Sequence, residues 1–182
     1  MLGPWDQALF RWINAGWSSP LLDQVFWFFS MGIKETWVRV GLAGVFLFLL
    51  IRRRARAAAI QAMFAWPLAN ELADVFKHGF QAARPHADAI FRVSELTSYG
   101  TMSAHAATMA AVATVMTLRL GRWGLPWILV AFLTGLSRVY VGVHYPSQVA
   151  LGWLGGFVCG WVIVKTWDAI VRLRRRRAQR TG

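Results

Sequence analysis

The sequence has 182 residues, enough for one domain with a substantial core, and 57% of them are hydrophobic. Its mean hydropathy of +0.42 is too high for an ordinary soluble fold, while 20 Lys and Arg against 8 acidic residues give a net charge of +12. In a soluble protein such a charge would suggest a nucleic-acid partner. Here the basic residues form short runs between long apolar stretches, which is typical of a membrane protein rather than of a nucleic-acid face; a nucleic-acid-binding protein would have to be soluble without detergent.

The N-terminal segment, residues 1–33, is expected to lie in the membrane interface. Its apolar residues, several of them tryptophans, alternate with polar ones in an amphipathic pattern, and tryptophan is favoured at the interface. Residues 21–33 are apolar but carry Asp23, so a sixth membrane span is the alternative. No basic region precedes an apolar core at the start of the sequence, so we expect no signal peptide and spans that insert by themselves.

Five apolar stretches predict membrane-spanning helices, because a span needs about 20 mostly apolar residues. They lie near residues 36–51, 57–77, 103–118, 124–142 and 147–168. The expected fold is therefore an all-α, polytopic transmembrane bundle forming one domain over 1–182. Its transmembrane core would be 34–170 and its basic tail 171–182. Glycines at every fourth position of the last stretch (Gly152, Gly156 and Gly160) predict close helix packing.

Arginine runs indicate how the five spans are oriented. Runs follow the first, third and fifth stretches, and such runs favour the cytoplasmic side. All three runs fall on one side of a five-span arrangement, so the C-terminus is expected to be cytoplasmic. The loop near 78–102 and the turn around His144 would then lie on the extracytoplasmic side.

Three groups of polar residues on that side are the candidates for chemistry, since charged residues in or beside spans are costly. They are Lys77 with Arg84-Pro85, then Ser103-Ala104-His105, then Ser137-Arg138 with His144. Each cation alone could be an interfacial anchor, and Lys77 could pair with Asp74. Together, arginine and lysine match phosphate oxygens, and a serine at a helix start adds free N–H groups. Two histidines can act as nucleophile and general acid, which predicts phosphoryl transfer without a metal or cofactor; the single cysteine, Cys159, also excludes Cys/His zinc spacing.

These residues and their spacing resemble the three signatures of the type-2 phosphatidic acid phosphatases, which are membrane lipid phosphatases. Lys77 and Arg84-Pro85 resemble the first signature, Ser103-Ala104-His105 the second, and Ser137-Arg138 with His144 the third. The resemblance implies that His144 is the nucleophile and His105 the general acid. It further implies that the phosphoryl group is bound by Lys77, Arg84, Ser103, Ala104 and Arg138. The family shares its helical core with the soluble vanadium haloperoxidases, and the predicted spans argue against that branch.

Two positions depart from the family pattern. Met102 and Ala104 replace the usual Pro and Gly of the second signature, and Gln148 stands where the family has an aspartate that orients the nucleophilic imidazole. Glutamine can accept a hydrogen bond from the ring but carries no charge, and losing such a charge can slow catalysis by orders of magnitude. Either Gln148 caps the helix starting near Pro146 while Asp74 or Glu71 substitutes, or the enzyme is slow, or the substitution preserves the fold and traps a bound state.

The resemblance implies a bacterial inner or plasma membrane phosphatase whose site faces the periplasm or cell exterior. Its expected substrate is a lipid phosphate or diphosphate, first undecaprenyl diphosphate, then phosphatidylglycerophosphate or phosphatidic acid. An alternative of another class is a catalytically impaired lipid-phosphate-binding protein, because of Gln148.

Overall fold

The computed structural model describes residues 3–86 and 89–181, and every regular element among them is a helix. This agrees with the all-α prediction. In chain order the elements are α1 (Pro4–Asn14), α2 (Pro20–Met31), the 3-10 turn η1 (Gly32–Lys34), α3 (Thr36–Ile51), α4 (Arg56–Phe80), α5 (Ala104–Leu120), the 3-10 turn η2 (Gly121–Gly124), α6 (Leu125–Tyr140) and α7 (Pro146–Thr181).

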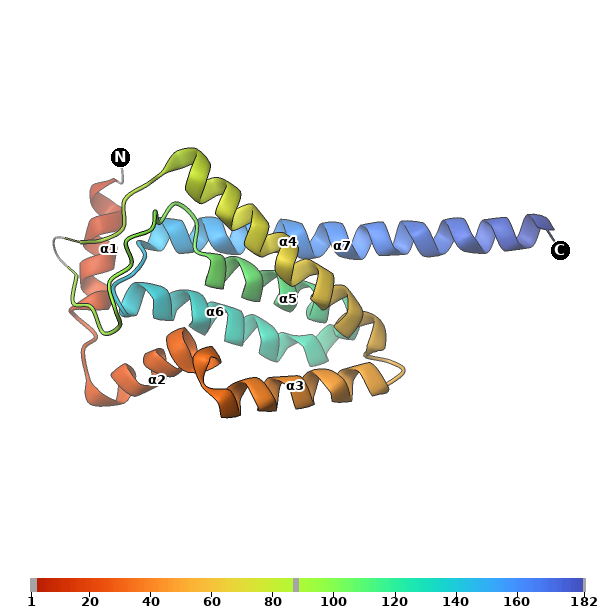
Figure 1. The fold of residues 1–182 in the computed structure, drawn as a ribbon, viewed down its shortest axis with the longest axis horizontal. Helices are drawn as coiled ribbons and strands as arrows, with labels where there is room; N and C mark the ends of the chain where they lie inside the picture. The colour runs from red at the N-terminus through yellow and green to blue at the C-terminus, as the bar shows by residue number, and fades with distance from the viewer. Residues whose placement is uncertain (1–2, 87–88, 182) are drawn as a thin grey trace.

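Helix α5 lies at the centre of the bundle and packs against α4, α6 and α7, as Figure 1 shows. The contact with α7 is so close that there is no room for side chains on its glycines. A Cβ on Gly156 would lie 2.1 Å from the Ala107 carbonyl oxygen, and one on Gly160 would lie 2.6 Å from that of Ala111. The predicted glycine face is therefore confirmed. It brings the first turns of α5 and α7 together.

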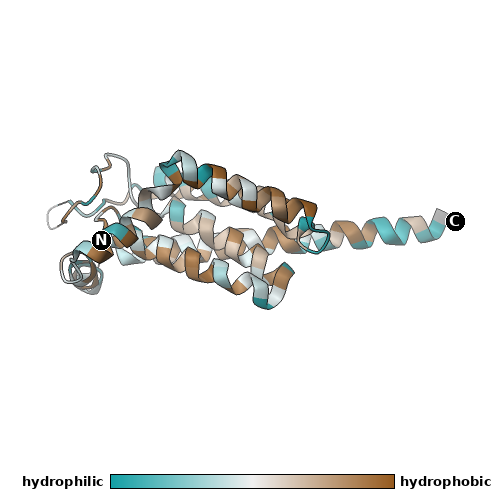
Figure 2. Cartoon of the chain, turned by 90° about the horizontal axis from the view of Figure 1, so that it is seen from below, coloured by the Kyte–Doolittle hydropathy of each residue, from teal (hydrophilic) through white to brown (hydrophobic). Residues whose placement is uncertain are grey.

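The outer surface of the bundle is apolar. No residue of α3 is buried, and Trp37 and Val40 on this helix are 66% and 67% exposed. Figure 2 shows that hydrophobic residues are frequent along the helices of the bundle. Two stretches, Ala104–Tyr140 and Pro146–Arg180, are long and apolar enough to cross a membrane, and α3 is a shorter apolar helix. The first stretch reverses direction at η2, so that α5 and α6 lie side by side (Figure 1).

The five predicted stretches coincide with helices α3 to α7, while their number as membrane spans stays a prediction. The N-terminal segment that we expected in the interface forms two helices, with Pro20 beginning the second. Helix α2 has 12 residues, and at 1.5 Å per residue it is about 18 Å long, well short of the roughly 30 Å hydrocarbon core. Whether it forms the alternative sixth span stays a prediction.

Buried polar contacts hold the N-terminal helices to the bundle. Asp6 of α1 accepts hydrogen bonds from the Ser147 backbone N–H (2.9 Å) and hydroxyl (2.6 Å) at the start of α7. A carboxylate is favourable there because the N-terminus of a helix carries partial positive charge. Asn14 donates to the carbonyl oxygens of Ile90 (3.0 Å) and Tyr140 (2.8 Å), tying α1 to the α4–α5 loop and to α6.

The three arginine runs lie toward one end of the bundle and the α4–α5 loop lies at the other. In Figure 1 the α3–α4 and α5–α6 connections and the C-terminal part of α7 are on the right, and the loop is on the left. The basic tail is a continuation of α7, which has 36 residues and is thus about 54 Å long. The orientation of the bundle in a membrane stays a prediction.

Candidate functional site

The α4–α5 loop carries Arg84 into the end of the bundle, where only 5% of the residue is exposed. Its Nε donates to the Ser98 carbonyl oxygen (2.6 Å), and Nη2 donates to the Ser98 hydroxyl and the Tyr99 carbonyl oxygen (both 3.2 Å). Nη1 donates to the Val143 carbonyl oxygen (2.7 Å) and lies 3.0 Å from Nε2 of His144. The guanidinium is thus held in one orientation beside an imidazole nitrogen.

A tight turn after α6 brings His144 to this position. The backbone N–H groups of Val143 and His144 both donate to the Arg138 carbonyl oxygen (3.1 and 3.2 Å). Gly142, just before Val143, has φ +88°, a left-handed conformation that glycine adopts without steric cost. The sequence Arg-Val-Tyr-Val-Gly-Val-His therefore folds back, so that His144 lies over the end of α6.

The contacts of His144 determine its tautomer. Its Nδ1 lies 3.2 Å from the Gly100 carbonyl oxygen and 3.0 Å from Oε1 of Gln148, both of which are acceptors. Its Nε2 faces Arg84, which can only donate. Nδ1 therefore carries the proton, and Nε2 presents its lone pair.

The electrostatic surroundings favour this neutral ring. Burial, and then the positive charges of Arg84 and Arg138, hold the pKa of His144 well below its ordinary value of 6.5. The hydrogen bond to Gln148 acts in the opposite direction but is a smaller effect. Only 3% of His144 is exposed. At neutral pH the imidazole is therefore uncharged, with a proton on Nδ1 and none on Nε2, inside a positively charged pocket.

Gln148 both caps α7 and orients the imidazole. Its Oε1 accepts from the Tyr145 backbone N–H (3.2 Å) as well as from His144, and its Nε2 donates to the Ala83 carbonyl oxygen (2.8 Å). A carboxylate could not make the last of these bonds. The expected capping role is therefore present, but it does not exclude contact with the ring.

Neither proposed substitute carboxylate hydrogen-bonds to His144 in the described part of the chain. Asp74 instead accepts from the Lys77 ammonium (2.7 Å) and from the Asn70 amide (3.4 Å). From the sequence, this ion pair was the alternative to phosphate binding by Lys77. It leaves Lys77 without a direct bond to either histidine, although its charge still acts on His105.

The second predicted group opens α5. Ser103 is the N-cap, and its hydroxyl accepts from the Ala106 backbone N–H (3.4 Å). Its own N–H donates to the Gln148 carbonyl oxygen (3.1 Å), which joins the first turns of α5 and α7. Ala104 is the first residue of the helix, where backbone N–H groups are free to bind an anion.

His105 lies beside this helix start and is partly buried. Within residues 3–86 and 89–181 its imidazole has no hydrogen-bond partner. The charges acting on it come from Arg138, Lys34, Lys77 and Arg84, and His105 in turn acts on His144. The two predicted histidines therefore share one electrostatic site.

Arg138 has a donor available inside the site. It is 4% exposed, and its Nη1 donates to the carbonyl oxygen of Ser30 (3.3 Å) and to the hydroxyl of the same residue. Its Nε is buried without a partner in the described part of the chain. Buried donors are nearly always satisfied, so an orphaned guanidinium N–H beside Arg84 and His144 suits an anionic ligand oxygen.

Sequence reasoning missed several residues of the site. Gly100 supplies the carbonyl oxygen to His144, and a Cβ there would lie 2.7 Å from Cγ of Arg84 and 2.9 Å from Oε1 of Gln148. Ser30 and Lys34 come from the N-terminal segment. None of the three stands in a recognisable motif. Gly100 alone offered a signal, because it is a glycine just before a predicted helix start.

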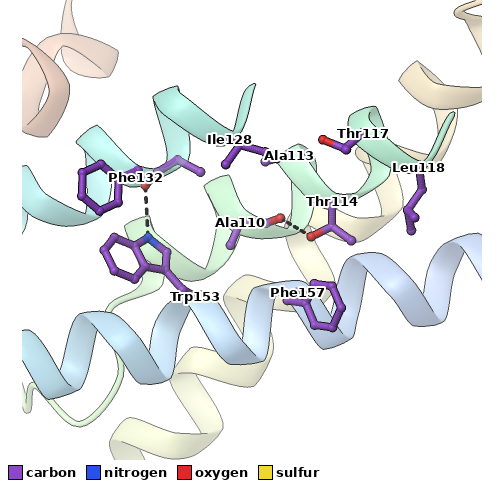
Figure 3. Close-up of a pocket in the computed structure, with 10 residues that line it drawn as sticks. Ala110, Ala113, Thr114, Thr117, Leu118, Ile128, Phe132, Trp153 and Phe157 are labelled. Carbon is purple, nitrogen blue, oxygen red and sulfur yellow. Dashed lines mark hydrogen bonds between the residues drawn. The ribbon is translucent and has the colours of Figure 1, made fainter. Parts of the chain in front are cut away.

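The site contains buried cations and the neutral imidazole of His144, a composition that suits an anion. Among the residues that the structure describes, no group of three or more His, Cys, Asp or Glu is arranged to hold a metal ion. An apolar cavity of about 330 Å³ lies elsewhere, between α5, α6 and α7, and is lined by residues such as Ala113, Phe132 and Trp153 (Figure 3). None of the predicted site residues lines it.

Comparisons with known proteins agree with these features. The model of the PAP2 superfamily matches residues 58–172. The chain is 30% identical to an undecaprenyl-diphosphatase of Sulfolobus acidocaldarius, with 81% of this chain and 71% of the relative covered. It is also 30% identical to a lipid A 4'-phosphatase of Porphyromonas gingivalis, with 89% and 72% covered.

Two solved structures have the same overall fold. The crystal structure of Aquifex aeolicus LpxE superposes with a TM-score of 0.74 at 29% identity, covering 90% of this chain and 96% of that one. A phosphatidylglycerolphosphate phosphatase of PAP2 type from Bacillus subtilis superposes with a TM-score of 0.70, covering 92% and 89%. At 18% identity the second likeness concerns the fold alone.

Proposed function

The chain belongs to the PAP2 superfamily, and from this we propose that it hydrolyses a lipid phosphate or diphosphate at the extracytoplasmic face of a membrane through a phosphohistidine. The observation that carries the proposal is the setting of His144. Its Nδ1–H is held by Gly100 and Gln148, and its Nε2 lone pair faces the Arg84 guanidinium at 3.0 Å. A neutral, oriented imidazole beside a buried cation is suited to attack phosphorus.

The proposed reaction has two steps. Nε2 of His144 attacks the phosphorus atom, the bond from phosphorus to the leaving oxygen breaks, and His105 donates a proton to that oxygen. Water then attacks the phosphohistidine, returns one proton to His105, and releases inorganic phosphate. Arg84, Arg138, the Ser103 hydroxyl and the free N–H group of Ala104 stabilise the charge on the phosphoryl oxygens in both steps.

Gln148 takes the place of an orienting carboxylate in this scheme. It fixes the ring through Oε1 but adds no negative charge to stabilise the positive imidazole that forms during attack. We therefore expect a working but slow enzyme. The neutral amide is also the observation that favours a second candidate function, a lipid-phosphate-binding protein with little turnover.

Undecaprenyl diphosphate is the first substrate to test, since the Sulfolobus relative is named for it. Lipid A phosphates follow, because the Porphyromonas relative is named as a lipid A 4'-phosphatase. Phosphatidylglycerophosphate and phosphatidic acid complete the panel.

The test is phosphate release from this panel by detergent-solubilised protein. His144→Ala should abolish release while thermal unfolding stays cooperative, whereas His78→Ala should leave release unchanged. His78 is a matched control because it is exposed at the same end of the bundle. Within the described residues its ring bonds only to the Asp74 carbonyl oxygen, at 2.8 Å. Release by His144→Ala at the wild-type rate would remove this residue from the reaction.

The same panel separates the two candidate functions. If the protein is an enzyme, the wild-type chain itself releases phosphate from at least one lipid of the panel. A binding protein binds a lipid phosphate, releases nothing, and gains turnover only when the charge is supplied by Gln148→Asp.

A further inference from the structure

The end of α2 and the turn η1 reach the site from outside the part of the chain that the PAP2 model matches. That model begins at residue 58, whereas Ser30 is the penultimate residue of α2 and Lys34 ends η1. Ser30 is fully buried, and both its carbonyl oxygen and its hydroxyl accept from Nη1 of Arg138. This segment is therefore attached directly to a residue of the site.

Lys34 ends η1, four residues after Ser30, and adds a fourth cation whose charge acts on His105. Of the charges acting on His105, that of Arg138 has the largest effect and that of Lys34 the next, ahead of Lys77 and Arg84. For His144 the largest charge effect is that of Arg84, followed by Arg138. Because electrostatic interaction weakens with distance and solvent screening, Lys34 is associated with the proposed general acid more than with the proposed nucleophile.

Lys34 also lies beside an apolar surface that is suited to contact lipid. It is exposed and stands two residues before the start of α3, the helix without buried residues. Ile33 and Trp37 around it are 46% and 66% exposed. Its backbone is fixed, because its carbonyl oxygen accepts from Nη2 of Arg39 at 2.7 Å. Across the described ranges no acceptor pairs with its ammonium group.

We propose that Lys34 binds the lipid-linked phosphate of a diphosphate substrate, while Arg84 and Arg138 bind the terminal phosphoryl group that is transferred to His144. This assignment rests on the proposed function. When the bond between the terminal phosphorus and the bridging oxygen breaks, negative charge accumulates on that oxygen and the lipid monophosphate leaves. His105 protonates it, and the Lys34 ammonium stabilises the remaining charge. Lys34 thus favours diphosphates over monophosphates.

The experiment compares binding of inorganic pyrophosphate and orthophosphate to the full-length chain in detergent, by calorimetry. The wild-type chain should bind pyrophosphate more tightly than orthophosphate. Lys34→Gln should weaken pyrophosphate binding roughly tenfold, the effect of losing one charge-assisted hydrogen bond, and change orthophosphate binding less than about twofold. Lys34→Arg should retain most of the preference.

Lys165→Gln is the matched control. It removes another exposed ammonium group, which lies 5.7 Å from the Trp161 ring centre on α7, and it should change neither affinity. Thermal unfolding of each variant verifies the fold, and Lys34→Arg distinguishes loss of charge from loss of structure.

The proposal is wrong if the wild-type chain does not prefer pyrophosphate, or if Lys34→Gln weakens both anions equally or neither. The proposed function fails by a different result, which is the absence of phosphate release by the wild-type chain from every lipid of the panel. Because the anion titrations require no turnover, the two failures are distinguishable.

Discussion

Replacing Gly100 with alanine tests whether the site depends on the close approach of its backbone to Arg84 and Gln148. A Cβ at this position would lie 2.7 Å from Cγ of Arg84, and 2.9 and 3.2 Å from Oε1 and Nε2 of Gln148. Carbon atoms in contact are normally about 3.5–4.0 Å apart, so Arg84 would have to move by roughly 1 Å. The clash involves the middle of the side chain, and the guanidinium beyond it is held by hydrogen bonds to the loop and to Val143.

The movement should affect the reaction more than the fold. Overpacking of this kind costs about 1–3 kcal/mol of stability, while a shift of roughly 1 Å in a catalytic group can lower the rate about 100-fold. We therefore expect Gly100→Ala to remain folded and to lose about 100-fold in the rate of phosphate release.

The assay is phosphate release from the best lipid of the panel, with thermal unfolding of the same preparation. Gly79→Ala is the control, because Gly79 lies near the same end of the bundle and a Cβ there would meet nothing within 4 Å. This change should be neutral or slightly stabilising in a helix. A Gly100→Ala protein as active as Gly79→Ala would show that the packing of Gly100 against Arg84 and Gln148 is irrelevant to the reaction.

Two further predictions concern His144 and Arg84. Because the pKa of His144 is held below 6.5 in the folded chain, the unfolded chain binds a proton there first, and folding stability should fall as the pH drops from 6.5 toward the folded pKa. The loss of stability should approach about 1.4 kcal/mol per pH unit. Thermal unfolding at pH 7.5 and 5.0 should show a smaller loss for His144→Asn than for the wild-type chain. An equal loss in the two proteins would contradict the buried neutral ring. Arg84→Lys keeps the charge but not the planar fork, so phosphate release should fall at least about tenfold, while Arg52→Lys, at the opposite end of the bundle, should have no effect.

The positions of the helices in the core followed from hydrophobicity. The stretch predicted at 36–51 coincides with α3 (Thr36–Ile51), and the others overlap α4 to α7. A long apolar run has to become a helix in lipid because its backbone groups have no water to bind. The N-terminal segment was less predictable. Its anchoring by Asp6 and Asn14 depends on partners more than 70 residues away in the chain.

Within the site, residue type predicted the candidates but not their pairing. Arg84 and His144 lie 3.0 Å apart, whereas Lys77 is bonded to Asp74, one helical turn before it. The ammonium group of a lysine, at the end of a flexible chain of four methylene groups, has many acceptors within reach, and only the packed structure selects one. Gln148 shows the same distinction, since its sequence position predicted a role beside His144 but not its bond to Ala83.

Hydrophobic runs predicted a helical bundle and three polar groups predicted phosphoryl transfer, because burial in lipid and the chemistry of phosphate restrict which residues can stand at such positions. The resemblance of these groups to family signatures narrowed the prediction to a lipid phosphatase. Tertiary structure alone brought Ser30 to Arg138, the Gly100 carbonyl oxygen to His144, and Lys34 toward His105. These residues have no distinctive pattern of their own. Their roles arise from the close packing of α5 on α7 and of α2 on α6, which brings distant segments within hydrogen-bonding distance.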